Sequence, residues 1–253
     1  MPGTSFDDVL IVNPPRIRPA TSDVVAQAEA ELGVRMPPGY AAFVERLGEG
    51  ALGNFVRVFA PAKMPDLTRA WRERVKEYWF WDTHEAGVKP ESLQDRGIVV
   101  ADSFDGDELC FDPADPETFF VLPRHEDLAR SVGPGFIAAV DWMLSGALNP
   151  WVEGWTFEAW THRAELREKH RNRPLDEAAR TVADLGGHSH MVDVDHRKTF
   201  FLPAIGGRLS LHRDEQGALD VDFAYDETAD PEVVKTVLVA VRGNAVPVSE
   251  RHG

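Results

Sequence analysis

Apolar residues recur every three or four positions in six stretches of the chain, and this spacing predicts six helices. The stretches cover residues 22–32, 38–47, 67–79, 136–144, 175–185 and 231–241. Thr21 and Asp230 can accept backbone N–H bonds as N-caps, and Gly33 can adopt the left-handed conformation that ends a helix. The helix over 38–47 carries Tyr40 and Phe43 on one apolar stripe, which we expect to be core.

Alternating apolar and polar residues, or short apolar runs between turn residues, predict strands in the rest of the chain. Four lie at 54–60, 98–101, 108–112 and 118–122, and four more at 191–195, 199–202, 208–213 and 219–224. Sharp bends at 105–107 and 112–113 join neighbouring strands as in a β-meander. The predicted fold class is therefore α+β, with helices packed on a mainly antiparallel sheet and a smaller α+β unit after it.

The same pattern divides the chain into four parts. Residues 1–20 read as an irregular arm, 21–146 as a first domain, 147–174 as a connector and 175–253 as a small C-terminal α+β unit. The connector holds Trp151, Trp155 and Trp160, which we expect to help dock the two units. A basic run at 163–173 is interleaved with glutamates at three- and four-residue spacing, which predicts a salt-bridged helix.

Charge changes the functional picture more than overall composition does. The formal net charge is −15, so we expect the protein to repel nucleic acid and anionic membranes and to attract a basic protein partner. The single cysteine, Cys110, excludes an internal disulfide and reads as a packing residue of a strand. Without a signal-peptide pattern or a long apolar run, the expected compartment is the cytoplasm and no membrane is involved.

Acidic and aromatic residues supply the candidate partner-binding surface. Residues 101–120 carry many carboxylates and neither lysine nor arginine. Carboxylates grip basic side chains in charge-assisted pairs, and exposed tryptophan is a common binding hot spot. The predicted partner-binding residues are Asp102, Asp105, Asp107, Glu108, Asp112, Trp79 and Trp81. The alternatives are a solvated turn edge for the carboxylates and internal packing for the tryptophans.

A second cluster could carry metal chemistry. A His-x-His pair on a strand points both imidazoles to one face, which suits zinc. The cluster consists of His188, His190, Asp193, Asp195 and His196. No cysteine supports it and its spacing matches no familiar zinc motif, so exposed strand polarity is the favoured interpretation, and we expect no cofactor.

Three stretches together resemble the SUKH superfamily, which includes fungal cell-wall-synthesis regulators and bacterial toxin-immunity proteins. They are LGVRMPPGYAAFVERLGEG (32–50), IVVADSFDGDELCFDP (98–113) and TFFVLPRHEDLARSVGPGFIAAVDWMLSG (118–146). The resemblance covers residues 21–146. The chain from about residue 150 onward shows no such likeness.

The resemblance implies a non-enzymatic binding protein. Its bacterial members commonly neutralise a cognate toxin, often a nuclease, so the first expectation is an immunity protein that occludes a basic toxin. The fungal branch implies an alternative, a regulatory scaffold with several partners. A metal-dependent enzyme using the region of His188–His196 is the third hypothesis.

Overall fold

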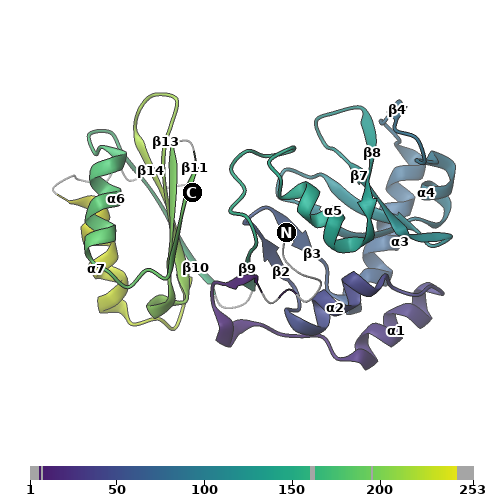
Figure 1. Cartoon of the computed structure of the whole chain (residues 1–253), viewed down its shortest axis with the longest axis horizontal. Helices are drawn as coiled ribbons and strands as arrows, with labels where there is room; N and C mark the ends of the chain where they lie inside the picture. Colours follow the sequence, from purple (N-terminus) through teal and green to yellow (C-terminus); the bar gives the residue numbers. More distant parts are fainter. Residues whose placement is uncertain (1–5, 7, 160–162, 195, 244–253) are drawn as a thin grey trace. The chain divides into compact units, whose positions relative to one another are not determined.

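A computed structural model describes residues 6, 8–159, 163–194 and 196–243 (Figure 1). The chain forms two compact units. Unit 1 comprises residues 1–10 and 17–159, and unit 2 comprises residues 11–16 and 160–253. The short segment 11–16 therefore belongs to unit 2, although the chain on either side of it belongs to unit 1.

Unit 1 is built on a nine-stranded sheet in the order β1-β9-β2-β3-β5-β6-β7-β8-β4. Most neighbours in it run antiparallel, and β4 pairs with β8 in parallel. The strands are β1 (Leu10–Ile11), β2 (Gly50–Leu52), β3 (Val56–Val58), β4 (Thr83–His84), β5 (Ile98–Ser103), β6 (Glu108–Asp112), β7 (Asp115–Leu122), β8 (Leu128–Pro134) and β9 (Thr156–Ala159). This is the mainly antiparallel sheet that the sequence predicts.

Helices lie against both faces of this sheet. They are α1 (Ser22–Leu32), α2 (Pro38–Arg46), α3 (Met64–Glu77), α4 (Pro90–Arg96) and α5 (Gly135–Met143), with a 3₁₀ turn η2 (Pro61–Lys63) before α3. Helices α3 and α4 pack on the strand face that carries Cys110 and Phe120. On the opposite face Phe119 contacts Phe136 of α5, with ring centroids 5.9 Å apart. The side chains of a strand alternate between faces, so neighbouring residues serve different cores.

The predicted stripe of α2 is confirmed as core. Tyr40, Phe43, Val44 and Leu47 are all buried. The Tyr40 hydroxyl donates to the carbonyl of Phe59 at 2.7 Å, which satisfies the only polar group of the stripe. Both predicted ends of α1 are confirmed. The Thr21 side chain accepts from the N–H of Val24 at the N-terminal end, and Gly33 adopts the left-handed conformation at the C-terminal end.

Unit 2 is a five-stranded antiparallel sheet with two helices packed on one face. The strand order is β10-β14-β13-β12-β11, and the apolar core lies between the sheet and the helices. The elements are η1 (Pro14–Arg16), β10 (Arg163–His170), α6 (Leu175–Asp184), β11 (His190–Val194), β12 (Arg197–Leu202), η3 (Pro203–Ile205), β13 (Gly207–Arg213), β14 (Leu219–Asp226) and α7 (Pro231–Arg242). The predicted small C-terminal α+β unit thus also contains a strand from the expected connector.

Three predictions about individual elements are wrong. The basic run forms strand β10 and not a helix, because it pairs along its length with β14. Helix α3 ends at Glu77, since Tyr78 is already extended, so the aromatic residues after it are not helical. The predicted connector 147–174 is divided, because its residues Thr156–Ala159 form β9, which pairs with β2 inside the sheet of unit 1. Trp160 lies outside the described residues.

Candidate protein-binding surface

The turn between β5 and β6 is fixed by one of the predicted carboxylates. Asp107 is only 4% exposed. Its carboxylate accepts from the Ser103 hydroxyl at 2.6 Å and from the backbone N–H of Arg124 at 2.9 Å. Gly106 has φ +94°, a conformation that a residue with a side chain rarely adopts. Asp107 therefore holds the turn in shape and has no free oxygen to offer a partner.

The turn presents the two residues at its tip to solvent. Phe104 is 49% exposed, which is unusual for a phenylalanine, and Asp105 next to it is exposed as well. The N–H of Phe104 donates to the carbonyl of Phe55 at 3.0 Å, so its backbone is anchored. The guanidinium of Arg57 lies over the Phe104 ring, 5.5 Å from its centre, and this cation–π contact stabilises the position of the ring.

A second exposed aromatic residue is linked to this turn by hydrogen bonds. The Asn149 side chain donates to the Asp105 carboxylate at 3.1 Å and accepts from the N–H of Trp151 at 2.8 Å. Trp151 is 55% exposed. We call Phe104, Asp105, Asn149 and Trp151 the aromatic–acidic surface. It combines two large apolar rings with a carboxylate that directly follows the anchored backbone N–H of Phe104.

The other predicted carboxylates are engaged inside unit 1. Asp102 pairs with Arg57 across neighbouring strands, and burial nevertheless raises the pKa of Asp102 against the effect of that arginine. Glu108 accepts from the indole N–H of Trp71 at 2.9 Å and pairs with Arg74. The first of these contacts joins β3 to β5, and the contacts of Glu108 join β6 to α3.

Asp112 is the most strongly stabilised of them as a carboxylate. Its burial works to raise its pKa, but hydrogen bonds from Arg96, Ser92 and the N–H of Ala114 outweigh burial and lower the pKa to about 2. These contacts link α4 to the end of β6. Asp112 thus serves the fold, and we do not propose it as a partner contact.

The low pKa of Asp112 predicts a contribution to acid stability. Its ordinary value is 3.8, so the folded state holds the ionised form and gains about 2 kcal/mol at neutral pH. This gain is fully present above pH 4 and is lost as the pH falls towards 2, about half of it by pH 3. Urea unfolding at pH 7, 4, 3 and 2 should show a smaller pH dependence for Asp112→Asn than for the wild type. Equal pH dependence of the two proteins would contradict the assignment.

The predicted tryptophans pack internally. Trp81 is 2% exposed, and its indole N–H donates to the carbonyl of Pro123 at 2.8 Å. Trp79 is half-buried, with its ring centroid 5.0 Å from that of Trp81. Of this aromatic run Tyr78 is the exposed member, at 67%. Trp81 offers no surface to a partner, and we do not propose it as a contact.

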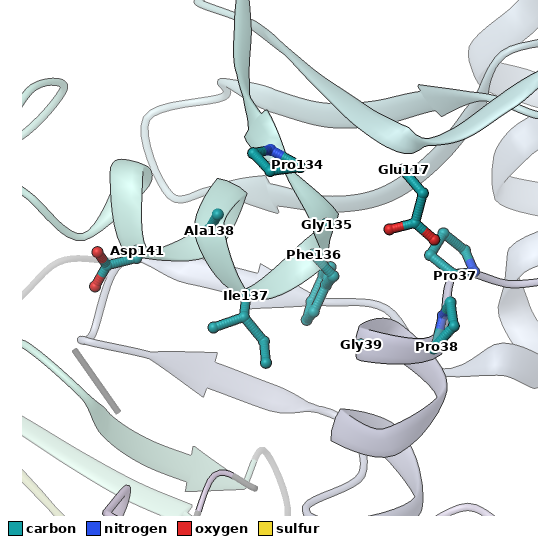
Figure 2. A pocket seen from close by; sticks show the side chains of 10 residues that line it. All are labelled: Pro37, Pro38, Gly39, Glu117, Pro134, Gly135, Phe136, Ile137, Ala138 and Asp141. Atoms are coloured by element: carbon teal, nitrogen blue, oxygen red, sulfur yellow. The ribbon is translucent and has the colours of Figure 1, made fainter. Parts of the chain in front are cut away.

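A pocket of about 330 Å³ opens between the first turns of α2 and α5 (Figure 2). Its walls are mostly apolar. The lining residues are Pro37, Pro38, Gly39, Glu117, Pro134, Gly135, Phe136, Ile137, Ala138 and Asp141. Figure 2 shows Glu117 and Asp141 at opposite ends, with Phe136 and Ile137 between them. The sequence offered only an indirect signal for this pocket, the two Pro- and Gly-rich helix starts at 37–39 and 133–135.

Comparison with known proteins assigns most of unit 1 to a family. Residues 19–141 match the SMI1 / KNR4 family (SUKH-1). This part of the chain belongs to the SUKH superfamily. A comparison of the whole sequence with curated proteins gave no match. The resemblance inferred from the three sequence stretches is thereby confirmed.

The SUKH assignment narrows the function to a class. It supports a role of the toxin-immunity or SMI1/KNR4 type with a protein partner, and the family is generally non-catalytic. The matched residues end at 141, so Asn149 and Trp151 of the aromatic–acidic surface lie beyond them. Among the described residues, no helix has the length and apolar character needed to cross a bilayer.

The histidine cluster of unit 2 is dispersed in the structure. His188 packs edge-on against Phe200, and Asp193 pairs with Lys198 across β11 and β12. His196 lies in the β11–β12 turn with φ +60°, and Asp195 lies outside the described residues. Within the described ranges, no three histidine, cysteine, aspartate or glutamate side chains gather as metal ligands would. The geometry gives the zinc hypothesis no support.

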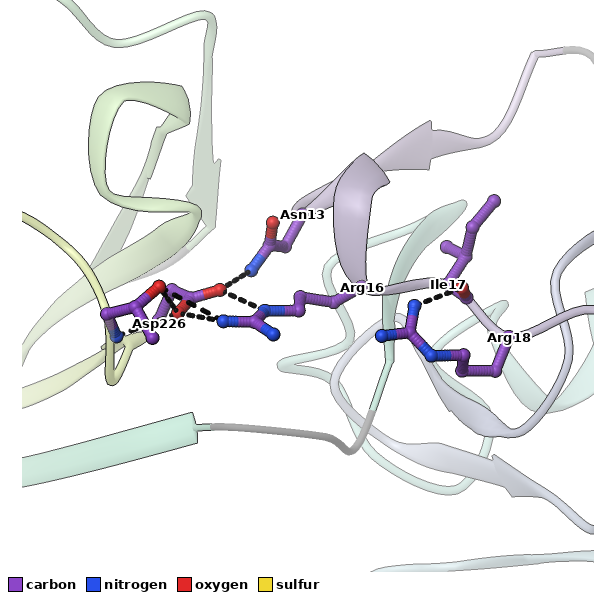
Figure 3. Close-up of polar contacts among 6 residues, drawn as sticks. Asn13, Arg16, Ile17, Arg18 and Asp226 are labelled. Atoms are coloured by element: carbon purple, nitrogen blue, oxygen red, sulfur yellow. Dashed lines mark hydrogen bonds and ion pairs between the residues drawn. The ribbon is translucent and has the colours of Figure 1, made fainter.

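A different polar cluster in unit 2 is structural (Figure 3). The Asp226 carboxylate accepts from both Arg16, at 2.5 and 2.8 Å, and Asn13, at 2.8 Å. The arginine holds the pKa of Asp226 well below its ordinary value. These bonds fasten segment 11–16 to the end of β14, which explains how a stretch near the N-terminus belongs to unit 2.

Proposed function

We propose that this protein is an immunity protein that binds and neutralises a basic toxin. The observation that carries the proposal is the aromatic–acidic surface of unit 1, the unit that contains the SUKH match: Phe104 and Trp151 are both about half exposed, and hydrogen bonds of Asn149 link Trp151 to Asp105. Aromatic rings dominate binding energy at protein interfaces, and complementary charge speeds the encounter. The net charge of −15 favours a basic partner for the same reason.

The mechanism we propose is occlusion. The SUKH domain covers the toxin's active cleft, and no covalent bond is made or broken. A stable complex of this kind buries on the order of 1,600 Å², which is far more than the aromatic–acidic surface alone provides. Other exposed parts of unit 1 therefore contribute, while the rings of Phe104 and Trp151 act as its anchors. The cytoplasm is the compartment in which we expect this neutralisation.

Binding variants test the proposal. With the cognate toxin domain as partner, Phe104→Ala and Trp151→Ala should each weaken affinity about ten- to thirty-fold, because each removes an aromatic anchor. Asp105→Lys should slow association and flatten its dependence on salt. Surface plasmon resonance at 50 and 300 mM salt measures both. Glu73→Lys, an equal charge change at an exposed position of α3, is the matched control.

The outcomes separate the hypotheses. Unchanged affinity in all three variants, or equal losses in Glu73→Lys, would remove the aromatic–acidic surface from the proposal. Several weak partners in place of one tight one would favour the alternative that the SMI1/KNR4 assignment also supports, a regulatory scaffold.

A further inference from the structure

We propose that the pocket between α2 and α5 takes one apolar side chain from a basic segment of the protein partner. In this arrangement Glu117 pairs with a lysine or arginine beside that side chain. The inference rests on the proposed function and adds a second anchor to it, with a defined chemistry.

The apolar floor of the pocket is preformed. Pro37 and Pro38 start α2 and Pro134 precedes α5, and proline rings restrict the backbone at each of these positions. A Cβ at Gly39 would lie only 3.1 Å from the Cβ of Phe136, so the two helix starts are in close contact. A volume of about 330 Å³ lined by Phe136 and Ile137 suits a single apolar side chain.

The rim of the pocket carries negative charge. Glu117 is exposed on β7, and its carboxylate has no hydrogen bond or ion pair with the described residues. It lies 3.9 Å from where a Cβ of Gly135 would stand, at the start of α5. At the other end, Asp141 accepts from the indole N–H of Trp155 at 2.9 Å. A cation entering this rim would meet the free carboxylate of Glu117 first.

Backbone donors complete the match to a peptide. The first amides of a helix have no acceptor within it, and no side chain caps either α2 or α5. In α2 the available donor is the N–H of Gly39, because Pro38 has no N–H and the N–H of Tyr40 donates to the carbonyl of Pro37 at 3.0 Å. This N–H and the first amides of α5 can donate to the carbonyls of a bound segment. A free anion would also accept from them, but it would have to approach Glu117 and a chain of net charge −15. The charge therefore favours a neutral carbonyl flanked by cationic side chains.

Synthetic peptides test the inference without knowledge of the partner. The probes are acetyl-Lys-Arg-Leu-Arg-Lys-amide, the same peptide with serine in place of leucine, and acetyl-Glu-Asp-Leu-Asp-Glu-amide. Titrations of the full chain are followed by the NMR signals of the Gly39, Gly135 and Ala138 amides. The basic leucine peptide should shift these signals and bind at least five-fold more tightly than the serine peptide, while the acidic peptide should not bind.

Two variants separate the pocket from general attraction between opposite charges. Glu117→Lys should weaken the basic leucine peptide at least five-fold, and Glu73→Lys, with the same change of charge on α3, should leave it unchanged. Both positions are exposed, so both variants should fold, which thermal unfolding checks. Equal binding of the leucine and serine peptides, or equal losses in the two variants, would overturn the inference.

Failure here and failure of the proposed function are distinguishable. Loss of toxin binding in Phe104→Ala with no response of the pocket to peptides would leave the immunity proposal standing and remove only the second anchor. If the pocket binds the basic leucine peptide but the protein has no toxin partner, the peptide-binding pocket would stand and the immunity proposal would be removed.

Discussion

Replacing Phe43 with alanine is expected to lower the free energy of unfolding of unit 1 by about 3–5 kcal/mol. Phe43 is fully buried at the centre of α2. Its ring lies 5.3 Å from that of Phe6, 5.8 Å from Phe136 and 5.7 Å from Phe157, in edge-on geometry. The truncation would leave a cavity between the N-terminal segment, α5 and β9, three elements far apart in the sequence.

Urea unfolding followed by tryptophan fluorescence measures this loss. Six of the seven tryptophans belong to unit 1, so the signal reports mainly on that unit. Phe104→Ala is the matched control: it removes the same ring from an exposed position and should cost less than about 1 kcal/mol. A loss below about 1 kcal/mol in Phe43→Ala would contradict the core position of the α2 stripe.

The helix that carries Phe43 could be predicted because its pattern is local. Pro37 and Pro38 mark its start, and four apolar residues fall on one stripe within a single stretch of ten residues. The aromatic run after α3 could not be predicted in the same way. Trp81 is buried because its N–H reaches the carbonyl of Pro123, 42 residues later. Helical spacing has no information about such a contact.

The basic run shows how two periods can fit one sequence. Its charges stand three and four residues apart, as on a helix, but they also alternate with Ala164 and Leu166, as on a strand. The strand forms because β14 supplies partners that local spacing does not reveal. Arg167 lies 3.2 Å from Asp222, and Lys169 lies 3.8 Å from Asp220.

The carboxylates of residues 101–120 look alike in the sequence, but in the structure some are buried and others are exposed. Asp107 and Asp112 are buried because Ser103, Arg124, Ser92 and Arg96 supply donors, whereas Asp105 stays at the surface. The exposed Phe104 is not among the predicted binding residues, although an apolar residue inside the Ser-Phe-Asp-Gly-Asp turn is a visible signal. Trp151 was expected to help dock the two units, and that role stays a prediction. Which carboxylate is free depends on donors supplied by other elements, and the sequence pattern does not show these pairings.

Unit 2 has a buried charge network that the sequence analysis did not anticipate. Glu168 of β10 has only 8% of its side chain exposed and accepts from Arg242 at the end of α7, with Nε 3.0 Å from Oε2. It also lies 3.1 Å from Nε2 of the buried His170. Burial works to raise the pKa of Glu168, but the contacts with Arg242 and His170 lower it on balance. The carboxylate is therefore held ionised on the helix-covered side of the sheet.

Arg242→Ala is expected to destabilise unit 2 by about 2–3 kcal/mol, because it leaves the Glu168 carboxylate buried without its main partner. This is less than a fully buried pair would lose, since Arg242 is 34% exposed and water screens part of its charge. Arg167→Ala is the matched control. Arg167 is next to Glu168 in the sequence and lies on the other face of β10, where its side chain is 81% exposed. Its replacement removes the same charge and should cost less than about 1 kcal/mol.

The double variant Glu168→Met with Arg242→Met tests the cause of the loss. Removing both charges replaces the unpaired carboxylate with apolar contacts, so it should be more stable than Arg242→Ala. Hydrogen exchange of the β10 and β14 amides reports on unit 2 without a tryptophan signal. Equal exchange rates in Arg242→Ala and Arg167→Ala would show that the network contributes no more than an exposed pair. The unfolding of unit 2 would then depend on its apolar core alone, with α7 held by Val234, Val237 and Val241.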